Sequence, residues 1–258
     1  MTTDSMRRSA LVAGVLYLIT FISSIPAVFL LQPALTNPAY ILGAGADGQV
    51  RLGALFDIIN CLTAIGTAVA LYSVVRRQHG GFAIGFVVSR LFEAAVLMIG
   101  TVSILAIVTL RQTGATAADP GALVTVGQSL VAVRDWSFVL GTGIPALNAF
   151  LLGWLMLRSQ LVPRAIPVLG LIGAPLFASW VVGYILGLTG ADSAWHGIAV
   201  APIFFWELSL GLWMTFKGFR KDAPLMIEAA AFTAAQGQDA APSSARPVIG
   251  VTSTTGAA

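Results

Sequence analysis

Six long apolar stretches divide this sequence, and all but one of its fourteen basic residues lie outside them. Each stretch is long enough for an α-helix to cross a hydrocarbon core about 30 Å thick. The apolar residues are continuous rather than alternating with polar ones, which predicts helices and not the strands of a barrel. The predicted spans are 9–31, 52–75, 82–110, 136–157, 165–188 and 195–216. The expected fold is an all-α, polytopic membrane bundle of six transmembrane helices.

The composition agrees with a single membrane domain. Only 10% of the 258 residues are charged, whereas a soluble domain has about 25%. We expect residues 1–221 to form the transmembrane domain and residues 222–258 to form a cytoplasmic tail. Within the tail, 224–235 is predicted as a short surface helix and 236–258 as disordered, because it has little to bury. Arg7 and Arg8 before an apolar run resemble the start of a signal peptide, but the run is too long, so a retained span is predicted.

The distribution of lysine and arginine predicts the orientation in the membrane. Nine basic residues flank the spans on one side and three flank them on the other. The nine are Arg7, Arg8, Arg76, Arg77, Arg158, Arg164, Lys217, Arg220 and Lys221, and the three are Arg51, Arg111 and Arg134. Because basic residues favour the cytoplasmic side, both termini are expected in the cytoplasm and the protein in the inner (plasma) membrane. The two longer loops, 32–50 and 112–133, are then external, and 122–133 is predicted as an interfacial helix.

Ionisable residues inside the predicted spans are the main candidates for function. Inserting Asp, Lys or Arg at the centre of a transmembrane helix costs roughly 2.5–3.5 kcal/mol. Such residues therefore usually face the bundle interior or a water-filled cavity. The predicted polar core consists of Asp57, Asn60, Arg90, Glu93, Asn148 and Glu207. Arg134 and Asp135 are predicted at the outer mouth of the fourth span.

Arg90 and Glu93 are three residues apart and therefore share one helix face. Glu93 and Glu207 are both expected near the membrane midplane, where they would share this one arginine. A structural role would use the charges to determine how the third and sixth spans pack. A functional role would leave one carboxylate free to hold a proton or to face a polar ligand. In either case, Arg90→Ala is expected to damage folding, and Glu207→Gln to be tolerated if Glu207 is protonated.

Several other classes of function are disfavoured by the sequence. His79 and His196 are predicted on opposite sides of the membrane with Cys61 between them, so no metal site and no cofactor are expected. The sequence has no P-loop, HExxH or paired CxxC pattern, which places an intramembrane enzyme last. The basic residues occur singly or in pairs rather than in a patch, which argues against nucleic acid despite a pI near 9.4. The lipid bilayer is the expected partner, and the sequence specifies no oligomeric state.

Six segments together resemble a known family. They are the Arg7-Arg8 start before Leu16-Tyr17-Leu18, Leu55-Phe56-Asp57-Ile58-Ile59-Asn60, Ser89-Arg90-Leu91-Phe92-Glu93, Val162-Pro163-Arg164, Trp206-Glu207-Leu208-Ser209-Leu210-Gly211-Leu212-Trp213 and Lys217-Gly218-Phe219. In this combination the chain resembles the uncharacterised bacterial six-helix membrane family called domain of unknown function 4386, from about Arg7 to Arg220. The resemblance implies the fold but no substrate or reaction. Two functions remain open: handling of a small solute or proton through the polar core, and a non-transporting scaffold whose buried charges only specify helix packing.

Overall fold

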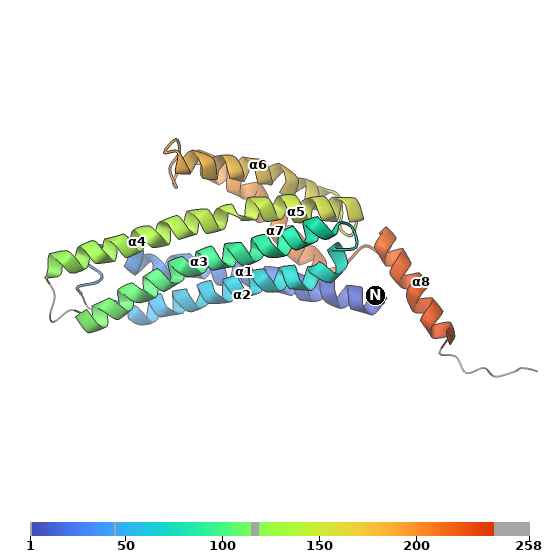
Figure 1. The fold of residues 1–258 in the computed structure, drawn as a ribbon, viewed down its shortest axis with the longest axis horizontal. Coiled ribbons are helices and arrows are strands. Elements are labelled where there is room, and N and C mark those ends of the chain that lie inside the picture. Colours follow the sequence, from blue (N-terminus) through green and yellow to red (C-terminus); the bar gives the residue numbers. More distant parts are fainter. Residues whose placement is uncertain (1, 44, 115–118, 240–258) are drawn as a thin grey trace, which may run out of the picture.

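The computed structural model describes residues 2–43, 45–114 and 119–239, and within them the chain forms eight α-helices (Figure 1). The helices are α1 (Thr3–Thr36), α2 (Asp47–Val75), α3 (Gly80–Gly114), α4 (Pro120–Gly143), α5 (Pro145–Ser159), α6 (Ala165–Ile185), α7 (Ala194–Phe216) and α8 (Pro224–Asp239). Six candidate spans are long and apolar enough to cross a membrane, with α4 and α5 together forming the fourth. The all-helical fold with six apolar spans confirms the prediction from the sequence.

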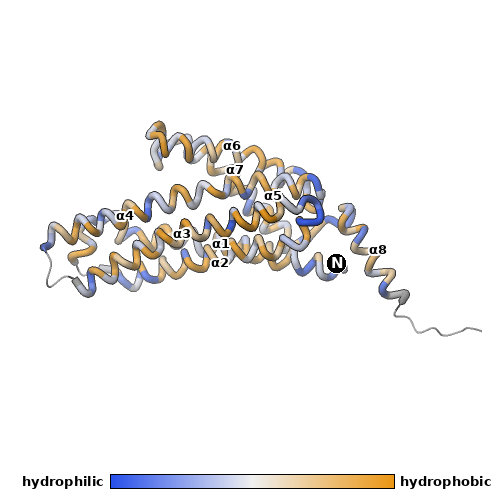
Figure 2. Tube along the Cα trace, in the orientation of Figure 1, coloured by the Kyte–Doolittle hydropathy of each residue, from blue (hydrophilic) through white to orange (hydrophobic). Residues whose placement is uncertain are grey.

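The helices pack side by side in a closed order around the centre of the bundle. Helix α1 packs on α2 and α7, α6 packs on α7 and α5, and α3 packs on α2, α4 and α5. The largest buried cluster includes Met6, Leu71, Leu155 and Met214, and it extends along α6 and α7 as far as Trp180 and Ala199. Hydrophobic residues follow most of each helix, whereas hydrophilic residues gather at the turns near the end that holds the N-terminus and α8 (Figure 2). One apolar cluster therefore joins all eight helices of the described chain.

The fourth span begins much earlier than the sequence predicted. Asp119 caps α4 by accepting a hydrogen bond from the backbone N–H of Ala122 at 3.1 Å, and Pro120 occupies the first turn. This is a strong helix start, so the segment 122–133 is the first part of α4 and not a separate interfacial helix. Arg134 therefore lies roughly 20 Å into a helix, rather than at its mouth. The predicted external loop 112–133 is correspondingly short, since α3 ends at Gly114.

Pro145 interrupts the fourth span between α4 and α5. The proline has no backbone N–H to donate to the carbonyl of Gly141, and this carbonyl accepts a bond from Ile144 instead, at 3.2 Å. Helix α5 then starts with Pro145 in its first turn. The interruption places a helix N-terminus inside the bundle.

The end of α7 is set by Gly218, whose φ of 71° lies in the left-handed region. The reversal directs the chain across the α5–α6 turn, where the N–H of Arg220 donates to the carbonyl of Leu161 at 2.8 Å. Helix α8 follows and packs its buried residues Leu225, Met226 and Ala229 on the bundle. The surface helix predicted for 224–235 thus exists but continues to Asp239, so 236–239 are helical and not disordered. The remaining tail, 240–258, lies outside the described residues.

A polar cluster closes the opposite end of α2 and α3. Asp47 accepts hydrogen bonds from the Tyr40 hydroxyl at 2.7 Å and from the Gln112 amide at 2.8 Å, and it forms an ion pair with Arg111. Burial and the bond to Asp47 raise the pKa of Tyr40 to about 12, so the phenol remains a hydrogen-bond donor at physiological pH. Arg51 donates to Gln112 at 2.7 Å and joins the same cluster. These contacts tie the α1–α2 connection to the end of α3.

Helices α1 and α7 approach so closely that their contact requires glycine. A Cβ added to Gly14 would lie 2.5 Å from the backbone nitrogen of Thr215 and 2.9 Å from the carbonyl oxygen of Gly211. Backbone atoms of a packed helix cannot shift as a flexible side chain can. Small residues at such crossings are characteristic of membrane helix pairs.

We predict that Gly14→Ala destabilises the protein by about 1–3 kcal/mol, because the new methyl group overpacks the α1–α7 contact. The thermal midpoint of the detergent-purified protein measures this change. Gly197→Ala on α7 is the matched control, since a Cβ there meets no atom within 4 Å. Equal midpoints for Gly14→Ala and the wild type would contradict the observed helix crossing.

Candidate functional site

Arg90 of α3 lies at the centre of a buried polar network. Its guanidinium donates to Glu93 at 3.0 and 3.3 Å, to the Tyr17 hydroxyl of α1 at 3.1 Å and to Glu207 of α7. The Arg90 side chain is only 4% exposed. The two carboxylates that the sequence placed near the midplane therefore share this one arginine, and the contact joins α1, α3 and α7.

Asn148 extends the network to α5. Its amide nitrogen donates to Oε2 of Glu93 at 2.6 Å, and its carbonyl oxygen accepts a hydrogen bond from Ser89. Asn148 lies one turn after Pro145, so the break in the fourth span brings the N-terminal end of α5 close to Glu93. The partial positive charge at a helix N-terminus stabilises a nearby carboxylate. Glu93 is thus held by a guanidinium, an amide and a helix end.

A second buried ion pair joins α2, α3 and α4. Arg134 contacts Oδ2 of Asp57 at 2.8 Å, and the hydroxyl of Thr101 donates to the same oxygen at 3.3 Å. Gly100 makes room for this pair, because a Cβ there would lie 2.9 Å from Cδ of Arg134. The sequence placed Arg134 beside Asp135 at the outer mouth, but the structure separates them: Arg134 is buried, and Asp135 is exposed.

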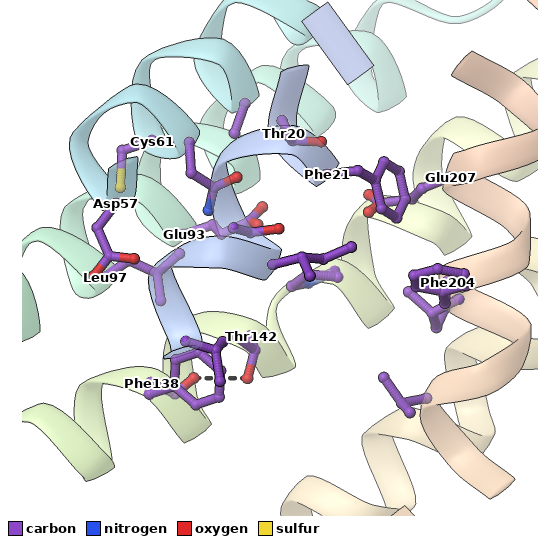
Figure 3. A pocket seen from close by; sticks show the side chains of 18 of the residues that line it. Thr20, Phe21, Asp57, Cys61, Glu93, Leu97, Phe138, Thr142, Phe204 and Glu207 are labelled. Atoms are coloured by element: carbon purple, nitrogen blue, oxygen red, sulfur yellow. Dashed lines mark hydrogen bonds between the residues drawn. The ribbon is translucent and has the colours of Figure 1, made fainter. Parts of the chain in front are cut away.

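A cavity of about 380 Å³ lies between the two ion-pair networks (Figure 3). Residues of α1 to α7 line it, and among them are Asp57, Asn60, Arg90, Glu93 and Glu207. Figure 3 shows Glu93 near the middle of the view, with Asp57 on one side and Glu207 on the other. The structure thus places five of the six predicted polar-core residues along one cavity. Asn148 does not line the cavity but holds Glu93, which does.

Some of the side chains that line the cavity are also exposed at the surface of the bundle. They are Ile25 and Val28 of α1, Phe138 of α4 and Phe204 of α7, which are between 38% and 47% exposed. The cavity is therefore not fully enclosed by the helices.

The model of one protein family, described as domain of unknown function (DUF4386), matches residues 12–218. The chain belongs to the DUF4386 family. The match covers the seven helices that form the cavity except for the first residues of α1. Neither a search of the curated proteins nor a search of the solved structures found a match. Family membership thus establishes the domain and leaves its biochemical role to be argued from the site.

Sequence reasoning did not identify several residues of the DUF4386 domain's polar networks. Tyr17 and Thr101 were missed because a single tyrosine or threonine in an apolar span is common and carries no pattern. Arg134 was counted as a flanking residue because the helix start at Asp119-Pro120 was not recognised, although this cap and proline pair was a usable signal. Cys61 is also buried and lines the cavity.

The described part of the DUF4386 domain offers acid–base groups but no clustered metal ligands. No group of three His, Cys, Asp or Glu side chains in the described residues could hold a metal ion. His79 and His196 lie near opposite ends of the bundle, at the starts of α3 and α7. The chemistry that the cavity offers is therefore ion pairing, hydrogen bonding and proton exchange on carboxylates.

We predict that Arg90→Ala destabilises the protein by about 3–5 kcal/mol, because it leaves two carboxylates buried beside each other without their cation. Unfolding in detergent, followed by circular dichroism, measures the loss. Adding Glu93→Gln and Glu207→Gln to Arg90→Ala should restore part of the stability, since the uncompensated charges are then removed. Arg7→Ala, at an exposed position of α1, serves as the control. An Arg90→Ala protein as stable as the control would rule out a structural role for the ion pairs.

Proposed function

We propose that this DUF4386 protein binds a small solute in its central cavity and moves the solute or a proton through the polar core. The observation that carries the proposal is the cavity itself, which reaches Arg90, Glu93 and Glu207 at about the middle of the spans. A bundle whose charges served only to specify packing would have no need of open space beside them. Ionisable groups within membrane spans are commonly part of ion or substrate paths.

The break between α4 and α5 supports the same proposal. Interrupted helices in membrane transporters place helix ends beside a ligand site at the midplane. Here Thr142, before the break, and Pro145, after it, both line the cavity. The two halves of the fourth span are also joined to different networks, α4 through Arg134 and α5 through Asn148. A change in one network can therefore reposition one half of the span relative to the other.

A scaffold is the second candidate, and one observation favours it. Each of the three buried carboxylates already has a guanidinium partner, Glu93 and Glu207 in Arg90 and Asp57 in Arg134. In a scaffold, neutralising Glu207 would change only the stability of the protein. In a transport protein, it would also change the flux of the proton or solute while the protein remains folded.

We predict that proteoliposomes containing the protein conduct protons faster than empty liposomes when a pH gradient is applied, as reported by an internal pH-sensitive dye. Glu207→Gln should reduce this flux at least tenfold, because the amide cannot exchange a proton. Glu228→Gln on the exposed surface of α8 should leave it unchanged. Equal flux in all vesicles, including empty ones, would favour the scaffold.

We also propose that both termini lie in the cytoplasm. The nine basic residues of the predicted inner flank all lie at or near the helix ends on the same side as the N-terminus and α8. The opposite flank keeps only Arg51 and Arg111, since Arg134 is buried within the bundle. The asymmetry in basic residues is therefore larger than the sequence alone indicated.

We predict that alkaline phosphatase fused after Lys221 is inactive, because this enzyme folds only outside the cytoplasm. The same reporter fused within the 186–193 turn between α6 and α7 should be active. Enzyme activity in whole cells measures both. An active fusion after Lys221 would reverse the proposed orientation.

A further inference from the structure

We propose that the cavity binds a monovalent organic cation with an apolar body, and that Glu207 is the counter-ion of the bound molecule. This inference rests on the proposed function, because it names the class of solute for the same cavity. Charge balance, the free hydrogen-bonding capacity of Glu207, and the nature of the cavity wall support it separately.

The charges around the cavity sum to one net negative charge when all are ionised. Three carboxylates, Asp57, Glu93 and Glu207, face two guanidiniums, Arg90 and Arg134. Among the residues that the structure describes, no lysine or histidine lines the cavity, and the Tyr17 hydroxyl accepts a hydrogen bond from Arg90. A net charge in a low-dielectric site needs compensation. A bound cation supplies it, and in the absence of a ligand a proton on one carboxylate does so.

Glu207 is the carboxylate best placed to receive a ligand. Glu93 uses both oxygens for Arg90 and one of them also for Asn148, and its side chain is 8% exposed. Glu207 uses only Oε1 for Arg90, and its side chain is 17% exposed. In the described part of the chain, Oε2 of Glu207 accepts no hydrogen bond. This oxygen is therefore available to a cation in the cavity.

An anion would find less favourable partners in the same cavity. The terminal nitrogens of Arg90 already donate to Glu93, Glu207 and Tyr17, and Arg134 contacts Asp57. Nε of Arg90 and Nη1 of Arg134 are buried and donate to no group in the described part of the chain. An anion that accepted from these nitrogens would raise the net charge around the cavity from one negative charge to two, which a low-dielectric site disfavours. A cation would instead neutralise the cavity.

Apart from Thr20, Ser24, Asn60 and Thr142, most of the remaining cavity wall is aromatic or aliphatic. Four phenylalanines contribute from four different helices: Phe21 of α1, Phe138 of α4, Phe177 of α6 and Phe204 of α7. The rings of Phe21 and Phe204 contact each other edge to face at 5.1 Å, and both lie on the same side of the cavity as Glu207 (Figure 3). Aromatic faces attract cations, especially poorly hydrated ones such as quaternary ammonium groups. This wall favours an organic cation over a hydrated inorganic one.

The size of the cavity agrees with a small organic molecule. A volume of about 380 Å³ lies near the lower end of the range of about 300–1,000 Å³ typical of ligand sites. Benzyltrimethylammonium is a suitable probe, because it combines one permanent positive charge with one aromatic ring. Its N-oxide analogue, N,N-dimethylbenzylamine N-oxide, has nearly the same shape and no net charge, and phenylmethanesulfonate has the opposite charge.

Binding of radiolabelled benzyltrimethylammonium to the full-length protein in detergent tests the proposal. We expect saturable binding, weakened at least tenfold by Glu207→Gln and reduced by Phe204→Leu. Phe205→Leu is the matched control, because Phe205 is the adjacent residue, is 56% exposed and does not line the cavity. Glu228→Gln on α8 is the control for loss of a carboxylate. A thermal melt of each variant separates loss of binding from loss of fold, and Glu207→Asp should restore part of the affinity if a variant without the carboxylate proves unstable.

Competition by the two analogues separates failure of this inference from failure of the proposed function. If the N-oxide or the sulfonate binds as tightly as the ammonium ion and Glu207→Gln has no effect, the cavity binds solutes but the cation assignment is wrong. If none of the three probes binds to the folded protein, both the cation assignment and the solute-binding role are contradicted. If only the ammonium probe binds and neither analogue displaces it, both the cation assignment and the solute-binding role are supported.

Discussion

The burial of one guanidinium determines much of this structure. Arg90 lies in the middle of an apolar bundle, where an unpaired charge is highly unfavourable, so acceptors have to converge on it from other helices. Glu93 is supplied by its own helix, Glu207 by α7 and the Tyr17 hydroxyl by α1. The close α1–α7 contact at Gly14 lies one turn from Tyr17. The break at Pro145 lies one turn before Asn148, which donates to Glu93. The packing of α1, α3 and α7 is therefore coupled to the pairing of the Arg90 charge.

The same constraint creates the cavity. Two charge networks, one at Arg90 and one at Asp57 and Arg134, hold α3 in common and draw α7 and α4 toward it from different directions. The space left between the networks is lined by carboxylates and phenylalanines. The carboxylates at this space are there because they pair with the buried guanidiniums. Together with the phenylalanines, they are the basis of the proposed ligand class.

The lengths of the apolar stretches and the free-energy cost of charges in hydrocarbon made most of the fold predictable. The partners of individual side chains were less predictable. The six spans, the turns marked by Arg76-Arg77 and Arg164, and the convergence of Arg90 with Glu93 and Glu207 all follow from the cost of polar groups in hydrocarbon. The partner of Asp57 did not follow, because Arg134 seemed to flank a helix that in fact begins at Pro120. The four phenylalanines of the cavity were equally hidden. In a sequence so rich in apolar residues, nothing distinguishes a ring that faces a cavity from one that faces lipid.

The central claim is that these polar side chains surround a cavity that water and small solutes can reach. Cysteine accessibility tests it most directly, using Asn60→Cys, which lines the cavity, and Leu62→Cys on the same helix, which is 62% exposed on the outside of the bundle. Both are made in a Cys61→Ala background and treated in membranes with a cationic methanethiosulfonate reagent. The account predicts rapid modification at position 60 and slow modification at position 62, where lipid surrounds the thiol. Equal, slow modification at both positions would show that the core is dry and would contradict the account.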